Sequence, residues 1–242
     1  LGEAYVLTGD GAAPWSHDWT DQVHWIPLAV LRPANTEEVA AVLSAANAAR
    51  VPVVPVSGNT GLAKGTKANG ALMLSLDRMS RVREINPKGR TATVEAGVIL
   101  SNLHEAAAEH NLIFPLTFGA RGSAMIGGCL STNAGGSNVV RYGSTRGLCL
   151  GIEAVTPTGE IMNLMSALHK VNSGFDLRDL MIGAEGTLGV ITAAVLKLFP
   201  KPLAYATAMV AAPDVDHALE LLYTLQSETG GAVEAFEYMP GA

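Results

Sequence analysis

The sequence is poor in charge and has no long hydrophobic run. Charged residues make up 16% of the 242 residues and hydrophobic residues 48%, whereas an average domain is about 25% charged. A chain of this composition is not disordered, and its length is sufficient to bury a core without a disulfide or metal. We expect an extensive interior, or an apolar face that meets a cofactor or another domain.

Cysteine is scarce as well. Cys129 and Cys149 are the only two, which excludes a disulfide framework and a cysteine zinc site and fits reduced thiols in a cytoplasmic-type compartment. Residues 1–4 have neither the basic nor the apolar part of a signal peptide. We therefore expect a cytoplasmic protein, with peripheral membrane association or an organelle matrix left open.

Basic patches, membrane spans and metal-ligand clusters are also missing. The formal net charge is −6, with no basic stripe that would neutralise phosphates, so no nucleic-acid partner is expected. The apolar stretch 190–196 is far short of the about 18 residues that a transmembrane helix needs. His104 and His110 are six residues apart, a spacing that does not place them on one helix face, and no metal site is predicted.

Hydrophobic periodicity predicts alternating helices and strands. The expected helices are 36–49, 101–110, 176–181 and 214–228, and the expected strands are 28–31, 51–56, 72–76, 82–85, 91–96, 150–155, 160–163, 190–199, 204–210 and 232–238. Residues 115–147 are glycine-rich and show little periodicity. The fold class is therefore α+β, with a small parallel sheet in a first subdomain (20–77) and a mostly antiparallel sheet in a second (78–202).

Glycine is the abundant residue. The chain has 26, where an average content of about 7% would give about 17. Three glycine segments stand at predicted strand ends: the first (57–61), the second (119–136) and the third (183–189). Glycine permits positive φ and close backbone approach, and successive N–H groups in such turns bind anions such as a pyrophosphate. The alternative is that the segments are ordinary turns with packing glycines.

The glycine spacing excludes the two best-known phosphate loops. Gly58, Gly61 and Gly65 do not form the G-x-G-x-x-G pattern of a Rossmann fold, and Gly65-Thr66-Lys67 has the wrong order for a Walker A loop.

Several motifs resemble a known flavoprotein family. They are PVSGNTGL (55–62), VEAGV (94–98), FPL (114–116), IGGCLSTNAGG (126–136), RYG (141–143), GAEGTLGVIT (183–192), FPKP (199–202) and AFEYM (235–239). In order and spacing the chain resembles the FAD-linked oxidases that share the FAD domain of p-cresol methylhydroxylase and vanillyl-alcohol oxidase. Within that family it is most similar to FAD-dependent D-2-hydroxyacid dehydrogenases of the D-lactate and D-2-hydroxyglutarate type.

The resemblance implies a set of FAD-binding residues. The pyrophosphate would be held by Ser57, Gly58, Asn59, Thr60, Gly61 and Leu62, and the flavin ring would lie near Pro115 and Leu116. The rest of the cofactor would be lined by Ser123, Gly127, Gly128, Asn133 and Gly136. The adenine or ring side would be closed by Glu185, Gly186 and Ile191. No histidine follows Gly58, so non-covalent FAD is expected. Ser57 and Ala184 depart from the glycine and serine of many relatives, and the Cβ of Ser57 is expected to narrow the approach to the cofactor.

The resemblance also implies a reaction and a domain arrangement. The reaction is oxidation of a D-2-hydroxyacid to the 2-oxoacid, with hydride transfer to FAD and electron transfer to a quinone, a cytochrome or an electron-transfer flavoprotein. Residues 1–202 would form the FAD-binding domain, and 203–242 the first strand–helix–strand of a second α+β substrate domain. In the family the base, the substrate-binding side chains and the metal site lie in that later domain and in a C-terminal segment, so no catalytic or metal-binding residue is assigned.

Alternatives remain at this point. One is a non-catalytic flavin-binding subunit that needs a partner chain, and another is a flavoenzyme of the same fold that acts on a sugar acid or an ether-lipid precursor. A homodimer is left open. Arg141 either serves loop carbonyls through its five donors or contacts an anion, and Arg121 is a candidate to approach the active site. Without the rest of a substrate domain, only partial FAD occupancy is expected.

Overall fold

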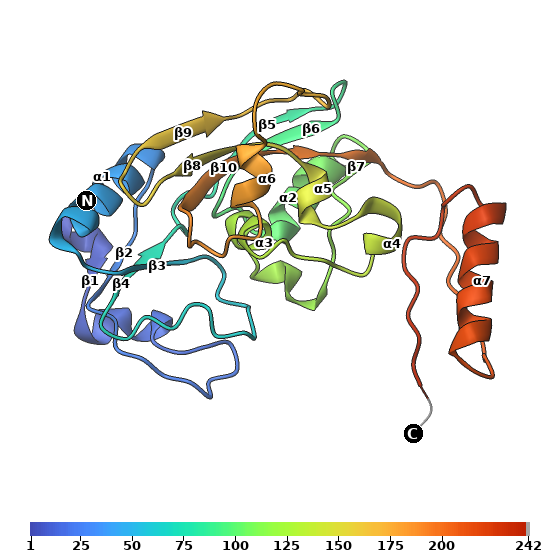
Figure 1. The fold of residues 1–242 in the computed structure, drawn as a ribbon, viewed down its shortest axis with the longest axis horizontal. Coiled ribbons are helices and arrows are strands. Elements are labelled where there is room, and N and C mark those ends of the chain that lie inside the picture. Colours follow the sequence, from blue (N-terminus) through green and yellow to red (C-terminus); the bar gives the residue numbers. More distant parts are fainter. Residues whose placement is uncertain (241–242) are drawn as a thin grey trace.

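The computed structural model describes residues 1–240, which form a body of two packed sheets and a separate helix, α7, near the C-terminal end (Figure 1). The last two residues of the expected segment 203–242 lie outside the described residues. Within the described part of the chain, no helix is long and apolar enough to cross a membrane.

The first sheet has the order β1-β2-β4-β3. Strands β2 (Ala29–Leu31), β3 (Val53–Val56) and β4 (Leu72–Ser75) pair in parallel, as the sequence predicts. Helix α1 (Thr36–Ala49) connects β2 to β3, and the Asn35 side chain accepts a hydrogen bond from the Glu38 amide at 2.8 Å, which caps the helix. The sequence does not reveal β1 (Val6–Leu7) or the 3₁₀ turns Glu3–Tyr5 and Gly9–Trp15, which are too short for a periodic pattern.

The second sheet is antiparallel, with the order β5-β6-β10-β8-β9. Its strands are β5 (Val82–Asn86), β6 (Thr91–Glu95), β8 (Cys149–Val155), β9 (Ile161–Leu164) and β10 (Val190–Lys197). A two-stranded sheet joins β7 (Leu112–Ile113) to β11 (Phe199–Pro200). The prediction of a mostly antiparallel second sheet is therefore confirmed.

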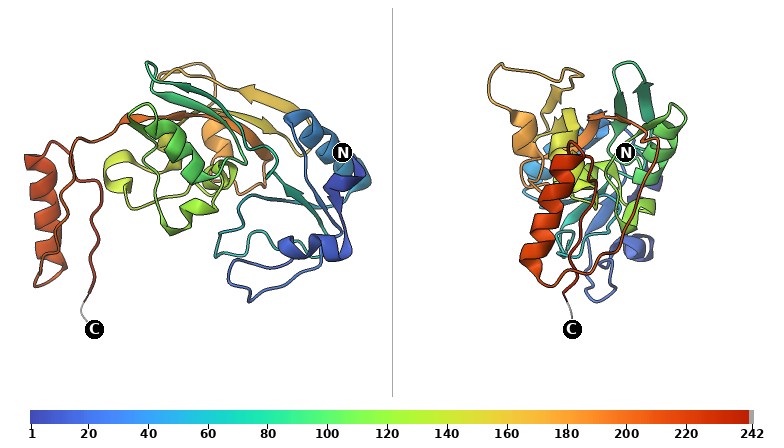
Figure 2. Two further views of the ribbon diagram at one scale, coloured as in Figure 1. Left: turned by 180° about the vertical axis from the view of Figure 1, so that it is seen from behind. Right: turned by 90° about the vertical axis from the view of Figure 1, so that its right-hand side faces the viewer.

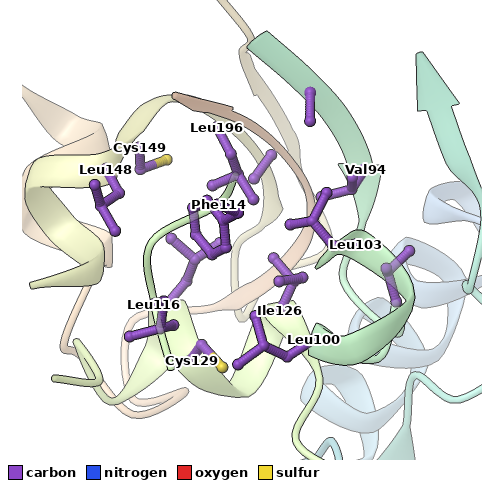
Figure 3. Packing of buried hydrophobic residues seen from close by; sticks show 14 of the residues in the cluster. Val94, Leu100, Leu103, Phe114, Leu116, Ile126, Cys129, Leu148, Cys149 and Leu196 are labelled. Carbon is purple, nitrogen blue, oxygen red and sulfur yellow. The ribbon is translucent and has the colours of Figure 1, made fainter. Parts of the chain in front are cut away.

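The main core lies between the second sheet and two helices, α2 (Leu100–Ala108) and α3 (Ile126–Ser131) (Figures 1 and 3). Leu103 and Ile126 point from these helices toward Val94 of β6 and Leu196 of β10, and all four side chains are almost fully buried. This packing holds the second glycine segment, which contains α3, against the centre of the sheet.

Residues 115–147 are more regular than the sequence predicts. They contain the 3₁₀ turn Gly119–Gly122, helix α3, and the short helices α4 (Val139–Tyr142) and α5 (Thr145–Leu148). The sequence pattern does not predict α3, because the helix contains Gly127 and Gly128 and glycine is a poor helix former. A Cβ at Gly127 would lie 2.8 Å from the Cβ of Ala96, so this glycine allows the helix to approach β6 closely. The predicted helix at 176–181 is present as α6 (Leu177–Met181).

Of the elements predicted after Pro202, the described residues contain only the helix. Asp214 accepts a hydrogen bond from the His217 amide at 2.9 Å at the start of α7 (Val215–Glu228). The expected strands 204–210 and 232–238 are wrong, since neither segment forms a strand in residues 1–240. A β-strand needs a neighbouring strand for its N–H and C=O groups, and this region lies apart from both sheets (Figure 2). Its side chains, such as Leu203, Tyr205 and Met239, are exposed.

A buried carboxylate stabilises the β5–β6 edge of the second sheet. Glu95 on β6 is 1% exposed and accepts hydrogen bonds from the amide N of Arg81 (2.9 Å) and from its Nη2 (2.8 Å), with Arg83 Nε at 3.4 Å. Burial raises the pKa of Glu95, but the hydrogen bonds and charges of the two arginines outweigh burial and leave the pKa below its usual value.

We expect Glu95→Gln to reduce the free energy of unfolding by roughly 2 kcal/mol at pH 7, because it removes the charge from hydrogen bonds to the arginines. A carboxylate with a lowered folded-state pKa stabilises the fold above its unfolded pKa of about 4.3 and loses that contribution as the pH falls through the folded value. The difference between wild type and variant should therefore shrink in acid. Urea unfolding at several pH values measures it.

The matched control is Glu84→Gln, at an exposed position on β5, which should unfold like the wild type. Equal stability of Glu95→Gln and wild type at pH 7 would contradict the assignment.

Candidate functional site

The three glycine segments meet around one cavity of about 320 Å³, a size typical of small-molecule sites. The cavity lies between the two sheets, since its lining includes Val56 at the end of β3, Leu76 just after β4 and Ile191 on β10. Ten of the sixteen residues that the sequence suggests for cofactor binding line it: Ser57, Gly58, Asn59, Thr60, Gly61, Gly127, Gly128, Glu185, Gly186 and Ile191.

The first glycine segment follows β3 and is held by an asparagine. Asn59 adopts a left-handed φ of 49°, which asparagine tolerates better than most residues. Its Nδ2 donates to the carbonyl oxygen of His17 at 2.8 Å, and its Oδ1 accepts from Thr66 Oγ1 at 2.7 Å. Within residues 1–240, the amide N–H groups of 58–61 donate to no protein acceptor. These four donors are available to an anionic ligand at the cavity.

Gly58 brings the first and second glycine segments into backbone contact. A Cβ at Gly58 would overlap the carbonyl oxygen of Ser123, so no other residue fits this approach without a shift of the backbone. Ser57 faces Gly128, where an added Cβ would lie 3.1 Å from the Cβ of Ser57. The serine that departs from the family pattern therefore has room because its neighbour in α3 is glycine.

The second and third glycine segments are hydrogen-bonded to each other. The amides of Gly183 and Glu185 donate to the carbonyl oxygens of Leu130 (3.0 Å) and Ser131 (2.9 Å). Asn133 Oδ1 accepts from the amide of Arg146 at 2.9 Å, and Arg146 Nη2 donates to the carbonyl oxygen of Ile182 at 2.6 Å. Arg146 thus links both segments, a role that sequence reasoning missed because its partners are distant in the chain.

The third glycine segment closes the cavity beside β3. Gly186 has a φ of 80°, and a Cβ there would overlap the ring of Pro55. Glu185, with a φ of 51°, is the only charged residue among the described residues that line the cavity. Since none of residues 1–240 places a basic side chain in the lining, an anionic group would be held by backbone amides.

Six suggested residues lie outside the cavity lining. Leu62 is exposed, Pro115 and Leu116 are buried, Ser123 and Asn133 make the contacts described above, and Gly136 packs against the backbone of Thr117. His104 Nε2 donates to the carbonyl oxygen of Leu116 at 2.9 Å and so fixes the segment that the resemblance places near the flavin. Burial lowers the pKa of His104, which keeps the ring neutral at pH 7.

Cys129, Phe118 and Thr66 line the cavity although the motif comparison did not single them out as ligands. Burial raises the pKa of Cys129 to about 12, so its thiol is protonated and serves packing. Arg121 is exposed and is not part of the lining. Among residues 1–240, no group of three histidine, cysteine or acidic side chains is arranged to hold a metal ion.

Comparison with known proteins gives a consistent match. Residues 27–165 match the family model described as FAD binding domain. The chain is 44% identical over 225 residues to D-2-hydroxyglutarate dehydrogenase of Xanthomonas citri pv. viticola, covering 93% of this chain and 47% of the relative. It is 38% identical to the mitochondrial D-2-hydroxyglutarate dehydrogenase of Bos taurus, covering 93% and 42%. The chain thus spans about half the length of these curated relatives.

Solved structures show the same fold. One structure of alkyldihydroxyacetonephosphate synthase superposes with a TM-score of 0.77 at 20% identity and covers 95% of this chain and 48% of that chain. A second structure of that enzyme has a TM-score of 0.74 at 22% identity and covers 84% and 39%. At this identity the likeness concerns the fold alone.

We expect Gly58→Ala to weaken FAD binding by roughly tenfold or more, about 1.4 kcal/mol, because its Cβ pushes the first glycine segment away from Ser123. Gly119→Ala is the matched control, since a Cβ there meets nothing within 4 Å. Titration followed by flavin fluorescence measures the affinity, and circular dichroism checks the fold. Unchanged affinity of a folded Gly58→Ala variant would show that the close approach is not needed.

Proposed function

The chain belongs to the family of FAD-binding domains, and on that premise we propose that it forms the FAD-binding part of a dehydrogenase that oxidises a D-2-hydroxyacid to the 2-oxoacid. The observation that carries this proposal is the meeting of three glycine segments around one cavity, with four free backbone amides at its edge. The relatives named D-2-hydroxyglutarate dehydrogenase favour that substrate over D-lactate.

The cavity residues fit FAD. Gly58 and Gly186 stand where a Cβ would collide with Ser123 and Pro55, so the absence of side chains at these positions lets the glycine segments close around the cavity. We assign the pyrophosphate to the amides of 58–61, because a double negative charge needs donors and none of the described residues that line the cavity has a basic side chain. FAD supplies the two-electron acceptor when it is bound.

The chain's own residues have binding and orienting roles in this proposal. Asn59 holds the first glycine segment in place, and Arg146 holds the second and third segments together. Gly127, Gly128 and Ile191 provide the wall toward the second sheet, and His104 fixes Leu116. No residue of the chain is assigned as the base that removes the hydroxyl proton. In this proposal the base lies in the half of the relatives that the chain does not match.

The domain arrangement is part of the same proposal. Residues 1–202 form the FAD-binding domain, and 203–242 begin a substrate domain that lies in the second half of proteins as long as the relatives. The exposed apolar side chains after Pro202 support this reading, because they need a covering polypeptide. The electron acceptor in this proposal is a quinone, a cytochrome or an electron-transfer flavoprotein.

The ether-lipid alternative has weaker support. Alkyldihydroxyacetonephosphate synthase shares the fold at 20% identity, whereas the D-2-hydroxyglutarate dehydrogenase of Xanthomonas citri pv. viticola is 44% identical. A shared fold does not establish a shared substrate. The alternative of a flavin-binding subunit with a separate partner chain differs from the main proposal in one respect. Residues 203–240 would be covered by a second polypeptide and not by a later part of the same one.

The test is an absorbance spectrum of the 242-residue chain with excess FAD, before and after desalting. We expect the bound-flavin bands before desalting, partial loss afterwards, and no bleaching by D-2-hydroxyglutarate under anaerobic conditions. A longer protein, in which this chain is joined to the second half of a relative, should retain FAD and be bleached by D- but not by L-2-hydroxyglutarate.

Two results would contradict the proposal. The absence of any FAD binding by both proteins would refute the cofactor site. Retention of FAD without bleaching by any D-2-hydroxyacid in the longer protein would refute the substrate class alone.

A further inference from the structure

The Arg141-Tyr142-Gly143 motif does not contact the cavity, and its two side chains meet a residue far along the chain. Arg141 and Tyr142 belong to α4, and both are bonded to the same oxygen of Glu234. Arg141 Nη1 lies 3.0 Å from Glu234 Oε1, and the Tyr142 hydroxyl donates to that oxygen at 2.9 Å. The Glu234 side chain is only 18% exposed, so this contact is partly shielded from water.

Tyr142 is itself fixed by the body of the protein. Its ring packs edge-on against Phe199 with 4.9 Å between the centroids, and the guanidinium carbon of Arg141 lies 5.0 Å from the ring centroid. Burial, followed by the hydrogen bond with Glu234, raises the pKa of Tyr142 to about 12. The phenol therefore remains a hydrogen-bond donor at neutral pH.

The contact joins α4 to the segment that follows α7. Helix α7 lies apart from both sheets, and the chain runs out to it and back beside α4 (Figures 1 and 2). The stretch that leads into α4 includes Ala134 and Gly135, which line the cavity. Glu234 is therefore held by residues that continue directly from the cavity wall.

We propose that Arg141, Tyr142 and Glu234 form a latch that fixes residues 203–240 in one position relative to the flavin cavity. The three are positioning residues, because none of them lines the cavity. In a protein as long as the relatives, this latch would set the direction in which the following polypeptide leaves the FAD-binding body. The latch is independent of the identity of the hydroxyacid.

In the latch, one carboxylate oxygen of Glu234 binds both the guanidinium group of Arg141 and the hydroxyl group of Tyr142. Hydrogen bonds to ionised groups are stronger than neutral ones, and partial burial protects them from the screening that makes exposed ion pairs weak. Removal of Glu234 leaves Arg141 and the Tyr142 hydroxyl without this acceptor. The segment then keeps its covalent connection through 200–214 but loses its anchor.

The experiment measures the position of α7 by pulsed electron–electron dipolar spectroscopy. Spin labels are attached to cysteines introduced at Glu109, an exposed residue at the end of α2, and at Ser227, an exposed residue on α7. The natural Cys129 and Cys149 are buried and are replaced by alanine in all proteins compared. We expect a single narrow distance peak in the parent and a broad distribution in Glu234→Ala, with Tyr142→Phe in between.

The matched control is Asp77→Asn. It breaks the bidentate, partly buried Arg32–Asp77 pair within the first subdomain and should leave the narrow peak unchanged. Charge reversal provides a second test that does not depend on Glu234→Ala alone. Arg141→Glu and Glu234→Arg should each broaden the distribution, and the double variant should narrow it again.

A narrow peak in Glu234→Ala, equal to that of the parent, would overturn the latch, as would a broad distribution in the parent itself. Broadening by Asp77→Asn to the same extent would show a general loss of stability and would also refute the proposal. FAD binding is measured separately on the same proteins, so the failure of the latch and the failure of the cofactor site are distinguishable.

Discussion

Close approach of one backbone to another is the constraint on which the rest of the structure depends. Gly58 packs against the Ser123 carbonyl and Gly186 against Pro55, and at each position a Cβ would overlap its neighbour. Gly127 permits the same closeness between α3 and Ala96. These contacts bring three segments that are far apart in the chain to one place between the two sheets, and the space between them is the cavity that we propose for FAD.

Side chains and backbone amides have different roles around the cavity. Side chains hold the segments in place: Asn59 fixes the first segment to His17 and Thr66, and Arg146 connects Asn133 of the second segment to Ile182, next to the third. The backbone amides of 58–61 have no acceptor among the described residues and, in our proposal, bind the ligand. Because basic side chains are absent from the described lining, the affinity for a cofactor depends on the geometry of the glycine segments more than on charge.

Much of the fold could be predicted from local sequence. The periodic helix α1 and the strands β5, β6, β8 and β9 depend on neighbouring residues, and the predictions for them were confirmed. Helix α3 could not be recognised, because its glycines, Gly127 and Gly128, serve tertiary contacts with Ala96 and Ser57 and not a turn. The strands expected at 204–210 and 232–238 failed because alternation alone provides no hydrogen-bonding partner.

The candidate site could also be predicted only in part from the sequence. The glycine segments could be found from their spacing and from the family resemblance. Arg146 and Glu234 could not, because their partners lie 36 and 93 residues away in the chain. Residues whose role arises only from the tertiary structure leave no pattern in a single sequence.

Hydrogen–deuterium exchange of the backbone amides, with and without FAD, tests the central claim most directly. The account predicts that FAD slows exchange in peptides that cover 57–66, with smaller protection at 127–136 and 183–189 and no change in α7. Unchanged exchange in 57–66 while FAD is bound would contradict it, because the free amides of that segment would then have no role in holding the cofactor.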